Sequence, residues 1–267
     1  PELESRAARL RRWGYPVEDL GRRQMESLEP NVRFEPYIDQ AVLFPTEAWI
    51  EGPRIAARMC ELAAEHGAEL RFAHQVTGMT RDGDHISGVV LANGETIVAD
   101  LVMNCAGPSA DRVASLAGRT LPLAPTLGLV VRITNTKRAI HRVMHAPRVH
   151  MRPDADDLVM LHHGDADDAI TRGEAPNVWA EELLNRAKEY VPVFAAARIS
   201  RWSIGTRPIP HDERTSAGLL PSIPGYGEVV THSGITLGPL LGRLVMHEIT
   251  TGEIDPLLAP FRPDRFP

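Results

Sequence analysis

The sequence has few cysteines, no long hydrophobic run and no excess of positive charge. Its two cysteines, Cys60 and Cys105, cannot build a disulfide framework or, by themselves, a structural zinc site. We therefore expect a reducing, cytoplasmic setting. No apolar stretch approaches the roughly 20 residues of a membrane-spanning helix, so no membrane span is predicted.

The charged residues and histidines argue against two further kinds of partner. The chain carries 29 Lys and Arg against 35 Asp and Glu, a formal net charge of −6, and the two signs are interspersed. Nucleic-acid binding needs a basic face, so no DNA or RNA partner is expected. The pairs His141/His145 and His162/His163 have no carboxylate at ligand spacing, so no metal site is predicted.

Hydrophobic periodicity predicts two kinds of structure along the 267 residues. Short apolar strands and helices precede residue 120 and follow residue 207, whereas 120–207 has longer strands and one helix. Residues 101–104 are typical of a buried, central parallel strand. Predicted helices cover 2–13, 17–28, 53–66, 109–118, 177–189 and 237–249, and predicted strands cover 37–43, 69–72, 75–81, 86–91, 101–104, 127–133, 148–152, 158–163, 196–204, 219–222 and 228–231. This order predicts an α/β domain interrupted by an antiparallel α+β domain.

The order of several motifs resembles one family of flavoproteins. Trp49-Ile50-Glu51-Gly52-Pro53 opens a helix, and the run Ala99-Asp100-Leu101-Val102-Met103-Asn104-Cys105-Ala106-Gly107-Pro108-Ser109 ends the region after it. Thr206-Arg207-Pro208 and Thr231-His232-Ser233-Gly234-Ile235-Thr236-Leu237-Gly238-Pro239 follow in the expected order. Together they resemble the D-amino-acid oxidase, glycine oxidase and sarcosine oxidase family of FAD-dependent oxidoreductases, over nearly the whole chain.

The resemblance implies a division into two domains. A Rossmann-like FAD-binding domain would comprise 1–36, 49–119 and 208–267, and an inserted antiparallel-sheet substrate domain would comprise 37–48 and 120–207. The family's Gly-x-Gly-x-x-Gly turn, which cradles the FAD pyrophosphate, is absent: Gly225-Tyr226-Gly227 is the nearest triplet, and Val230 stands at its third glycine position. We therefore expect a βαβ segment before Pro1 in the full-length protein.

The resemblance also implies which residues contact the cofactor and substrate. Val76 would border the adenine, although a plain strand valine explains it equally well. Small residues at Cys105, Ala106 and Gly107 would bring backbone close to FAD, unless the glycine only serves a strand-to-helix turn. Cys105 itself is expected to fill space rather than to do redox chemistry.

Two more features complete the expected site. Ser233, Gly234, Ile235, Thr236 and Leu237 would present a helix N-terminus to the flavin, the alternative being an ordinary capped helix. Arg207 would bind the substrate carboxylate through its planar fork, the alternative being a surface ion pair.

The implied reaction is oxidation of the CH–NH bond of an amino acid or amine by hydride transfer to flavin. The first alternative is a 2-hydroxy acid oxidoreductase, of the 2-hydroxyglutarate type, with the same architecture. The second is a non-catalytic or incomplete flavoprotein subunit whose site another chain completes, as an oligomer or with a partner. The exact substrate and the electron acceptor, oxygen or a partner, are open at this point.

Overall fold

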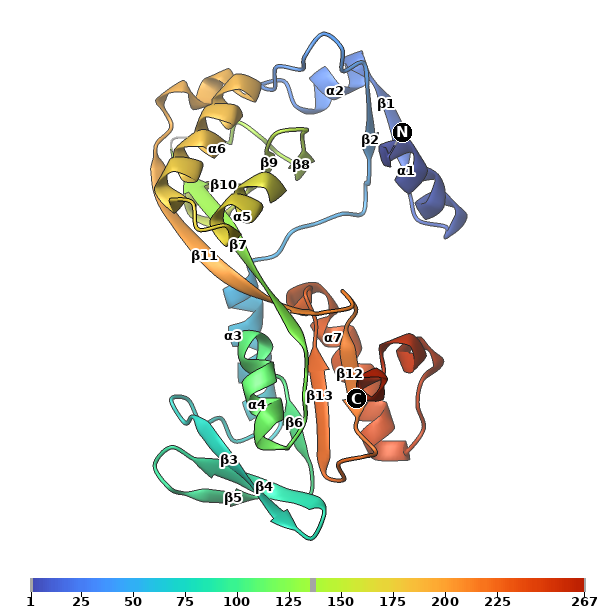
Figure 1. Cartoon of the computed structure of the whole chain (residues 1–267). Coiled ribbons are helices and arrows are strands. Elements are labelled where there is room, and N and C mark those ends of the chain that lie inside the picture. The colour runs from blue at the N-terminus through green and yellow to red at the C-terminus, as the bar shows by residue number, and fades with distance from the viewer. Residues whose placement is uncertain (1, 135–137, 267) are drawn as a thin grey trace. The chain divides into compact units, whose positions relative to one another are not determined.

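The computed structural model describes residues 2–134 and 138–266, which form two compact units (Figure 1). Unit 1 contains residues 1–51 and 127–205, and unit 2 contains 52–126 and 206–267. The chain passes from one unit to the other three times, so neither unit is continuous in sequence. The expected inserted domain, 120–207, has boundaries near the last two of these crossings. Residues 1–36, expected with the cofactor domain, cluster with unit 1, and the roles of the two units as substrate and cofactor domains stay a prediction.

Unit 1 begins with two helices and a two-stranded sheet. Helix α1 (Glu2–Arg12) ends one residue before the predicted end at 13, and the helix predicted over 17–28 is wrong in its first part. There β1 (Glu18–Gly21) pairs antiparallel with β2 (Gln40–Leu43), and α2 (Arg22–Leu28) begins only afterwards. Gly21 is extended, with φ −82° and ψ 169°, so it ends the strand and starts the helix.

The larger part of unit 1 is a five-stranded sheet covered by helices. The strand order is β11 (Ile199–Pro210), β7 (Leu123–Ile133), β10 (Val159–His162), β9 (His150–Pro153) and β8 (Met144–His145). β10 pairs antiparallel with both β7 and β9, and β8 pairs antiparallel with β9. Helices α5 (Gly164–Thr171) and α6 (Pro176–Tyr190) share one hydrophobic core with this sheet. The antiparallel sheet predicted within 120–207 is therefore confirmed.

Unit 2 contains two three-stranded sheets. One is the meander β3 (Val76–Asp82), β4 (His85–Leu91) and β5 (Thr96–Val98). The other has the order β12 (Ser216–Leu219), β13 (Tyr226–Val230) and β6 (Val102–Asn104), in which β13 pairs parallel with β6. The predicted parallel strand at 101–104 is thus confirmed, but it lies at the edge of the described sheet rather than at its centre.

Helices cover both faces of the β12–β13–β6 sheet. Helix α7 (Gly234–Thr251) packs on the face that carries Ala217, and α4 (Ala110–Leu116) packs on the opposite face, against Val230. Helix α3 (Gly52–Glu65) was predicted from its apolar stripe, yet none of its residues is buried. Short 3-10 helices lie at Gly107–Ser109, Ala155–Asp157, Pro192–Ala196, Pro256–Phe261 and Pro263–Arg265.

The strand predicted at 69–72 is wrong. These residues are exposed, have no regular structure apart from a turn at Phe72, and pair with no other strand. A β-strand forms only where another strand pairs with it, and apolar residues such as Leu70 and Phe72 do not by themselves provide that partner strand. Within 2–134 and 138–266, no helix combines the length and the apolar character needed to cross a membrane.

Candidate cofactor site

Two strand-to-helix connections meet at one edge of the β12–β13–β6 sheet. Tyr226 pairs with Val102 and Glu228 with Asn104, so β13 and β6 run in parallel and end side by side. β6 leads through 105–107 into a 3-10 turn and α4, and β13 leads through 231–233 into α7. In open α/β sheets ligands bind in the crevice beyond the carboxyl ends of parallel strands. Two of the predicted cofactor-binding segments are therefore brought to such an edge.

The first connection is a turn formed by Cys105, Ala106 and Gly107. Gly107 has φ 55°, a left-handed conformation that favours glycine, and a Cβ there would meet no atom within 4 Å. Asn104, directly before the turn, accepts a hydrogen bond from the Ala106 backbone N–H at 3.2 Å and donates from Nδ2 to the Ala110 carbonyl at 2.8 Å. The backbone of the turn is thus accessible at Gly107, and the Asn104 side chain stabilises the turn through these two hydrogen bonds.

Cys105 is an exposed residue of this turn. Desolvation by neighbouring atoms nevertheless raises the pKa of its thiol, and a hydrogen bond with the Val229 backbone lowers it only in part. A raised pKa keeps the sulfur protonated at neutral pH, and a thiol is a poor nucleophile. The expectation that Cys105 fills space rather than doing redox chemistry stays a prediction.

The second connection places the N-terminus of α7 at the same edge. Ser233 is the N-cap residue, and its carbonyl accepts a hydrogen bond from the Leu237 N–H at 2.8 Å. Gly234, Ile235 and Thr236 are exposed. Their backbone N–H groups lack partners within the helix, and the helix dipole adds partial positive charge. This end of α7 can therefore receive an electron-rich ligand atom.

Arg207 and Val76 lie in the same unit as the two connections. Arg207 is half-buried near the end of β11 and is followed by Pro208, which fixes the backbone locally. Val76 begins β3 in the other sheet, where it pairs with Leu91. Their roles in binding substrate and adenine stay predictions.

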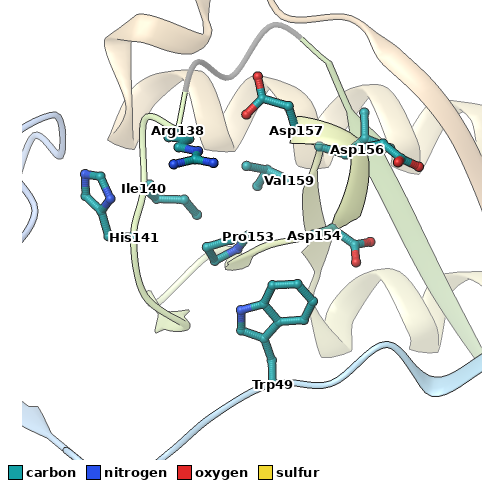
Figure 2. Close-up of a pocket in the computed structure, with 10 residues that line it drawn as sticks. Trp49, Arg138, Ile140, His141, Pro153, Asp154, Asp156, Asp157 and Val159 are labelled. Carbon is teal, nitrogen blue, oxygen red and sulfur yellow. The ribbon is translucent and has the colours of Figure 1, made fainter. Parts of the chain in front are cut away.

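A cavity of about 710 Å³ lies in unit 1, and none of the predicted cofactor- and substrate-binding residues lines it (Figure 2). Asp154 on its wall accepts hydrogen bonds from Arg132 at 2.8 Å and Arg152 at 3.1 Å, and the Arg152 guanidinium lies 4.8 Å from the ring centre of Trp49. The carboxylate and the aromatic ring are therefore already engaged by arginines. The lining residues are Trp49, Arg138, Ile140, His141, Pro153, Asp154, Asp156, Asp157, Leu158 and Val159.

A row of histidines crosses three strands of unit 1. His150 on β9 is in register with His145 on β8 and with His162 on β10, and its ring centre lies 4.7 Å and 5.9 Å from theirs. The ring of His163 is 5.1 Å away. Burial, with the charges of His145, His163 and His162, lowers the pKa of His150 to about 4. Within the described ranges, no three His, Cys, Asp or Glu side chains are arranged to hold a metal ion.

Sequence reasoning missed this row and a buried polar cluster beneath the 105–107 turn. The pair Asn104 and Tyr226 is 122 residues apart in sequence, so only the pairing of β6 with β13 brings them together. In the sequence, this cluster was indicated only by two polar residues, Asn104 and Glu228, within otherwise apolar strands.

The parallel strands, their two turns and the exposed helix N-terminus are typical of an α/β fold that binds a cofactor beyond the carboxyl ends of its strands. A family model described as FAD dependent oxidoreductase matches residues 1–248, and the chain belongs to this family. FAD is the cofactor of this family. The site at the carboxyl ends of β6 and β13 is of the kind that binds such a cofactor.

Individual relatives agree with the family. A hydrogen cyanide synthase subunit HcnC from Pseudomonas aeruginosa is 27% identical over 256 residues, 92% of this chain and 60% of that protein. A glycine oxidase from the same species is 27% identical over 235 residues, 84% of this chain and 62% of that protein. The crystal structure of glycine oxidase from Geobacillus kaustophilus superposes with a TM-score of 0.79 at 24% identity, covering 98% of this chain and 70% of that one. The chain thus spans about 60% of the length of the curated relatives named here.

Proposed function

We propose that this chain forms the larger part of an FAD-dependent oxidoreductase that oxidises the CH–NH bond of an amino acid or amine. The observation that carries the proposal is the meeting of the 105–107 turn and the α7 N-terminus at adjacent parallel strand ends, in the unit that also contains Arg207. The names of relatives, glycine oxidase among them, support the substrate class.

The residues present fit one part of FAD. Gly107 leaves room for a close approach of backbone, and the amides of Gly234, Ile235 and Thr236 are accessible. These groups would hold the flavin ring at its electron-rich edge, because N–H donors and the positive helix end favour developing negative charge. When bound, FAD supplies the two-electron oxidation itself. The pyrophosphate would need a glycine-rich turn that this sequence does not contain.

Arg207 would bind the substrate carboxylate. A guanidinium makes two parallel charge-assisted hydrogen bonds to a carboxylate, which fixes the orientation of the α-carbon as well as binding it. The half-buried position of Arg207 reduces the screening of such a pair by water.

The test uses the complete, flavin-loaded enzyme with Arg207→Ala and Arg207→Lys. We expect Arg207→Ala to raise KM for an amino acid roughly ten- to hundredfold, and to change KM for the amine that lacks the carboxyl group much less. Arg207→Lys should recover only part of the loss, because an ammonium cannot reproduce the fork. The matched control is Arg201→Ala, an exposed arginine on the same strand, which should leave both values unchanged.

Equal losses for the acid and the amine would contradict the role of Arg207. The second candidate, oxidation of a 2-hydroxy acid, shares the carboxylate and differs only in the oxidised bond. Turnover of a hydroxy acid without turnover of the matching amino acid would establish that alternative. A purified full-length protein without a flavin absorption band would instead support an incomplete subunit. Cytoplasmic location and any partner chain stay predictions.

A further inference from the structure

A cluster of polar side chains is buried directly beneath the 105–107 turn. It lies between the β12–β13–β6 sheet and α4, and its members are 0–6% exposed: Asn104, Arg119, Ser216, Tyr226 and Glu228. Burying a charged pair costs several kcal/mol in desolvation, so such a pair is weak as a device for stability alone. Its geometry indicates what it does instead.

The first part of the cluster fixes the Glu228 carboxylate. Arg119 donates from Nε to Oε2 at 3.1 Å and from Nη2 to Oε1 at 3.2 Å. The other Arg119 bonds go to the carbonyls of Pro263 at 2.6 Å and Phe266 at 3.2 Å. Held by this fork, Glu228 can only accept hydrogen bonds.

The second part of the cluster links the Glu228 acceptor to Asn104 through hydrogen bonds whose donor-to-acceptor direction is fixed. Tyr226 has a single hydroxyl hydrogen, which it donates to Glu228 Oε2 at 3.3 Å. Its oxygen is therefore left to accept, and it accepts from Asn104 Nδ2 at 2.9 Å. The same Nδ2 donates to the Ala110 carbonyl at 2.8 Å. The amide nitrogen of Asn104 is thus committed on both sides, and Oδ1 must face the Ala106 N–H, 3.2 Å away.

We propose that Asn104 is a positioning residue for the cofactor turn, and that Glu228 acts through Tyr226 to set the orientation of its amide. Glu228 takes the hydroxyl hydrogen of Tyr226, so the Tyr226 oxygen and the Ala110 carbonyl both accept from the amide nitrogen of Asn104 and together determine which end of Asn104 faces Ala106. The consequence for function rests on the proposed flavin contact of the 105–107 turn. A turned amide would point N–H at N–H and displace the backbone of that turn.

The chain offers a matched pair of variants. Tyr226→Phe removes the hydroxyl that joins Glu228 to Asn104 and keeps the ring. Ser216→Ala removes a different buried hydroxyl, which donates to Glu228 Oε1 at 2.6 Å, and leaves the path to Asn104 intact. Both variants take one donor from the same carboxylate. A merely structural role predicts equal effects from the two.

The experiment measures hydrogen–deuterium exchange at the Ala106 amide in the full-length, flavin-loaded protein, together with the visible circular dichroism of its flavin. We expect Tyr226→Phe to speed exchange at Ala106 about three- to tenfold, the value of one ordinary hydrogen bond, and to change the flavin spectrum. Ser216→Ala should do neither. Equal exchange at Ala106 in the two variants would overturn the proposal.

The effect of Tyr226 on the Ala106 amide and the contact of the turn with the flavin can be measured separately. Faster exchange at Ala106 with an unchanged flavin spectrum would uphold the role of Tyr226 and remove the flavin contact of the turn. If Tyr226→Phe does not fold, Asn104→Asp and Asn104→Leu replace it. The aspartate keeps an acceptor oxygen for Ala106 and should retain the protection that leucine loses. Equal exchange in these two variants would refute the role of Asn104.

Discussion

The histidine row in unit 1 should make this unit sensitive to acid, and the pH range follows from His150. The Nδ1 atom of His150 is buried and has no hydrogen-bond partner among the residues described. A proton on the ring would bring positive charge among His145, His162 and His163, and the Asp167 carboxylate would oppose this only in part. The folded state therefore resists protonation of His150, whereas the unfolded chain does not.

The sign and size of the effect follow from the pKa. Because the folded state lowers the pKa of His150 from 6.5 to about 4, the unfolded chain takes up this proton first as the pH falls. Stability is complete above pH 6.5, declines between 6.5 and about 4, and is constant below. At about 1.36 kcal/mol per pKa unit the loss has an upper bound of about 3–4 kcal/mol. His150 is only half-buried, so solvent screening should reduce it to about 1–2 kcal/mol.

The assay is urea unfolding of the wild type and of His150→Gln at pH 7 and pH 4.5, followed by tryptophan fluorescence. Trp13, Trp49, Trp179 and Trp202 are the four tryptophans of the sequence, and all lie in unit 1, so the signal reports this unit alone. We expect the wild type to lose about 1–2 kcal/mol more than the variant between the two pH values.

The control is His141→Gln, because His141 is exposed in the same unit. This variant should follow the wild type at both pH values. If the wild type and His150→Gln lose stability in parallel, the row is not a proton-sensitive element and the reasoning from burial is wrong.

Two further predictions concern stability. Gly225 has φ 77°, and a Cβ there would collide with the Ile86 carbonyl, so Gly225→Ala should cost more than about 2 kcal/mol in the free energy of unfolding. Gly252→Ala, at φ 75° in open space, should cost only about 1 kcal/mol, and equal losses in denaturant would contradict the collision. Buried Asp167 accepts from the Leu129 N–H and from His162, each at 2.7 Å, so Asp167→Asn should lose about 1–3 kcal/mol. The neighbouring exposed Asp168→Asn should lose almost nothing in the same urea titration, and a matching loss there would disprove the role assigned to Asp167.

The sequence predicted elements where local pattern and tertiary pairing agree. The apolar run at 101–104 forms a parallel strand because β13 pairs with it, and the apolar stripe after Pro53 forms α3 because helical spacing is a local property of the sequence. The segment 17–28 was predicted as one helix, but pairing with β2 converts its first part into a strand. Helix α5 was missed because its Asp-rich start, capped by His163, lacks an apolar stripe of helical length.

The candidate site divides in the same way. The sequence predicted the turn at 105–107 and the helix start at 233–237, because turns and helix N-termini depend on residues that are neighbours in sequence. The buried polar cluster beneath the 105–107 turn could not be predicted from the sequence. Arg119 and Glu228 are 109 residues apart, and no spacing rule joins positions at that distance. The register of the sheet determines which polar side chains come into contact.

The three crossings between the units have a consequence for the order in which the protein is made. A ribosome that has reached residue 205 has produced every residue of unit 1 but only 52–126 of unit 2. Domains generally fold as their residues emerge, so unit 1 can form while β6 still waits for β13. The edge at which both turns meet is therefore among the last parts to be completed. A chain released between residues 206 and 225 would contain the whole of unit 1 and no partner strand for β6, so termination there removes the cofactor site entirely rather than weakening it gradually.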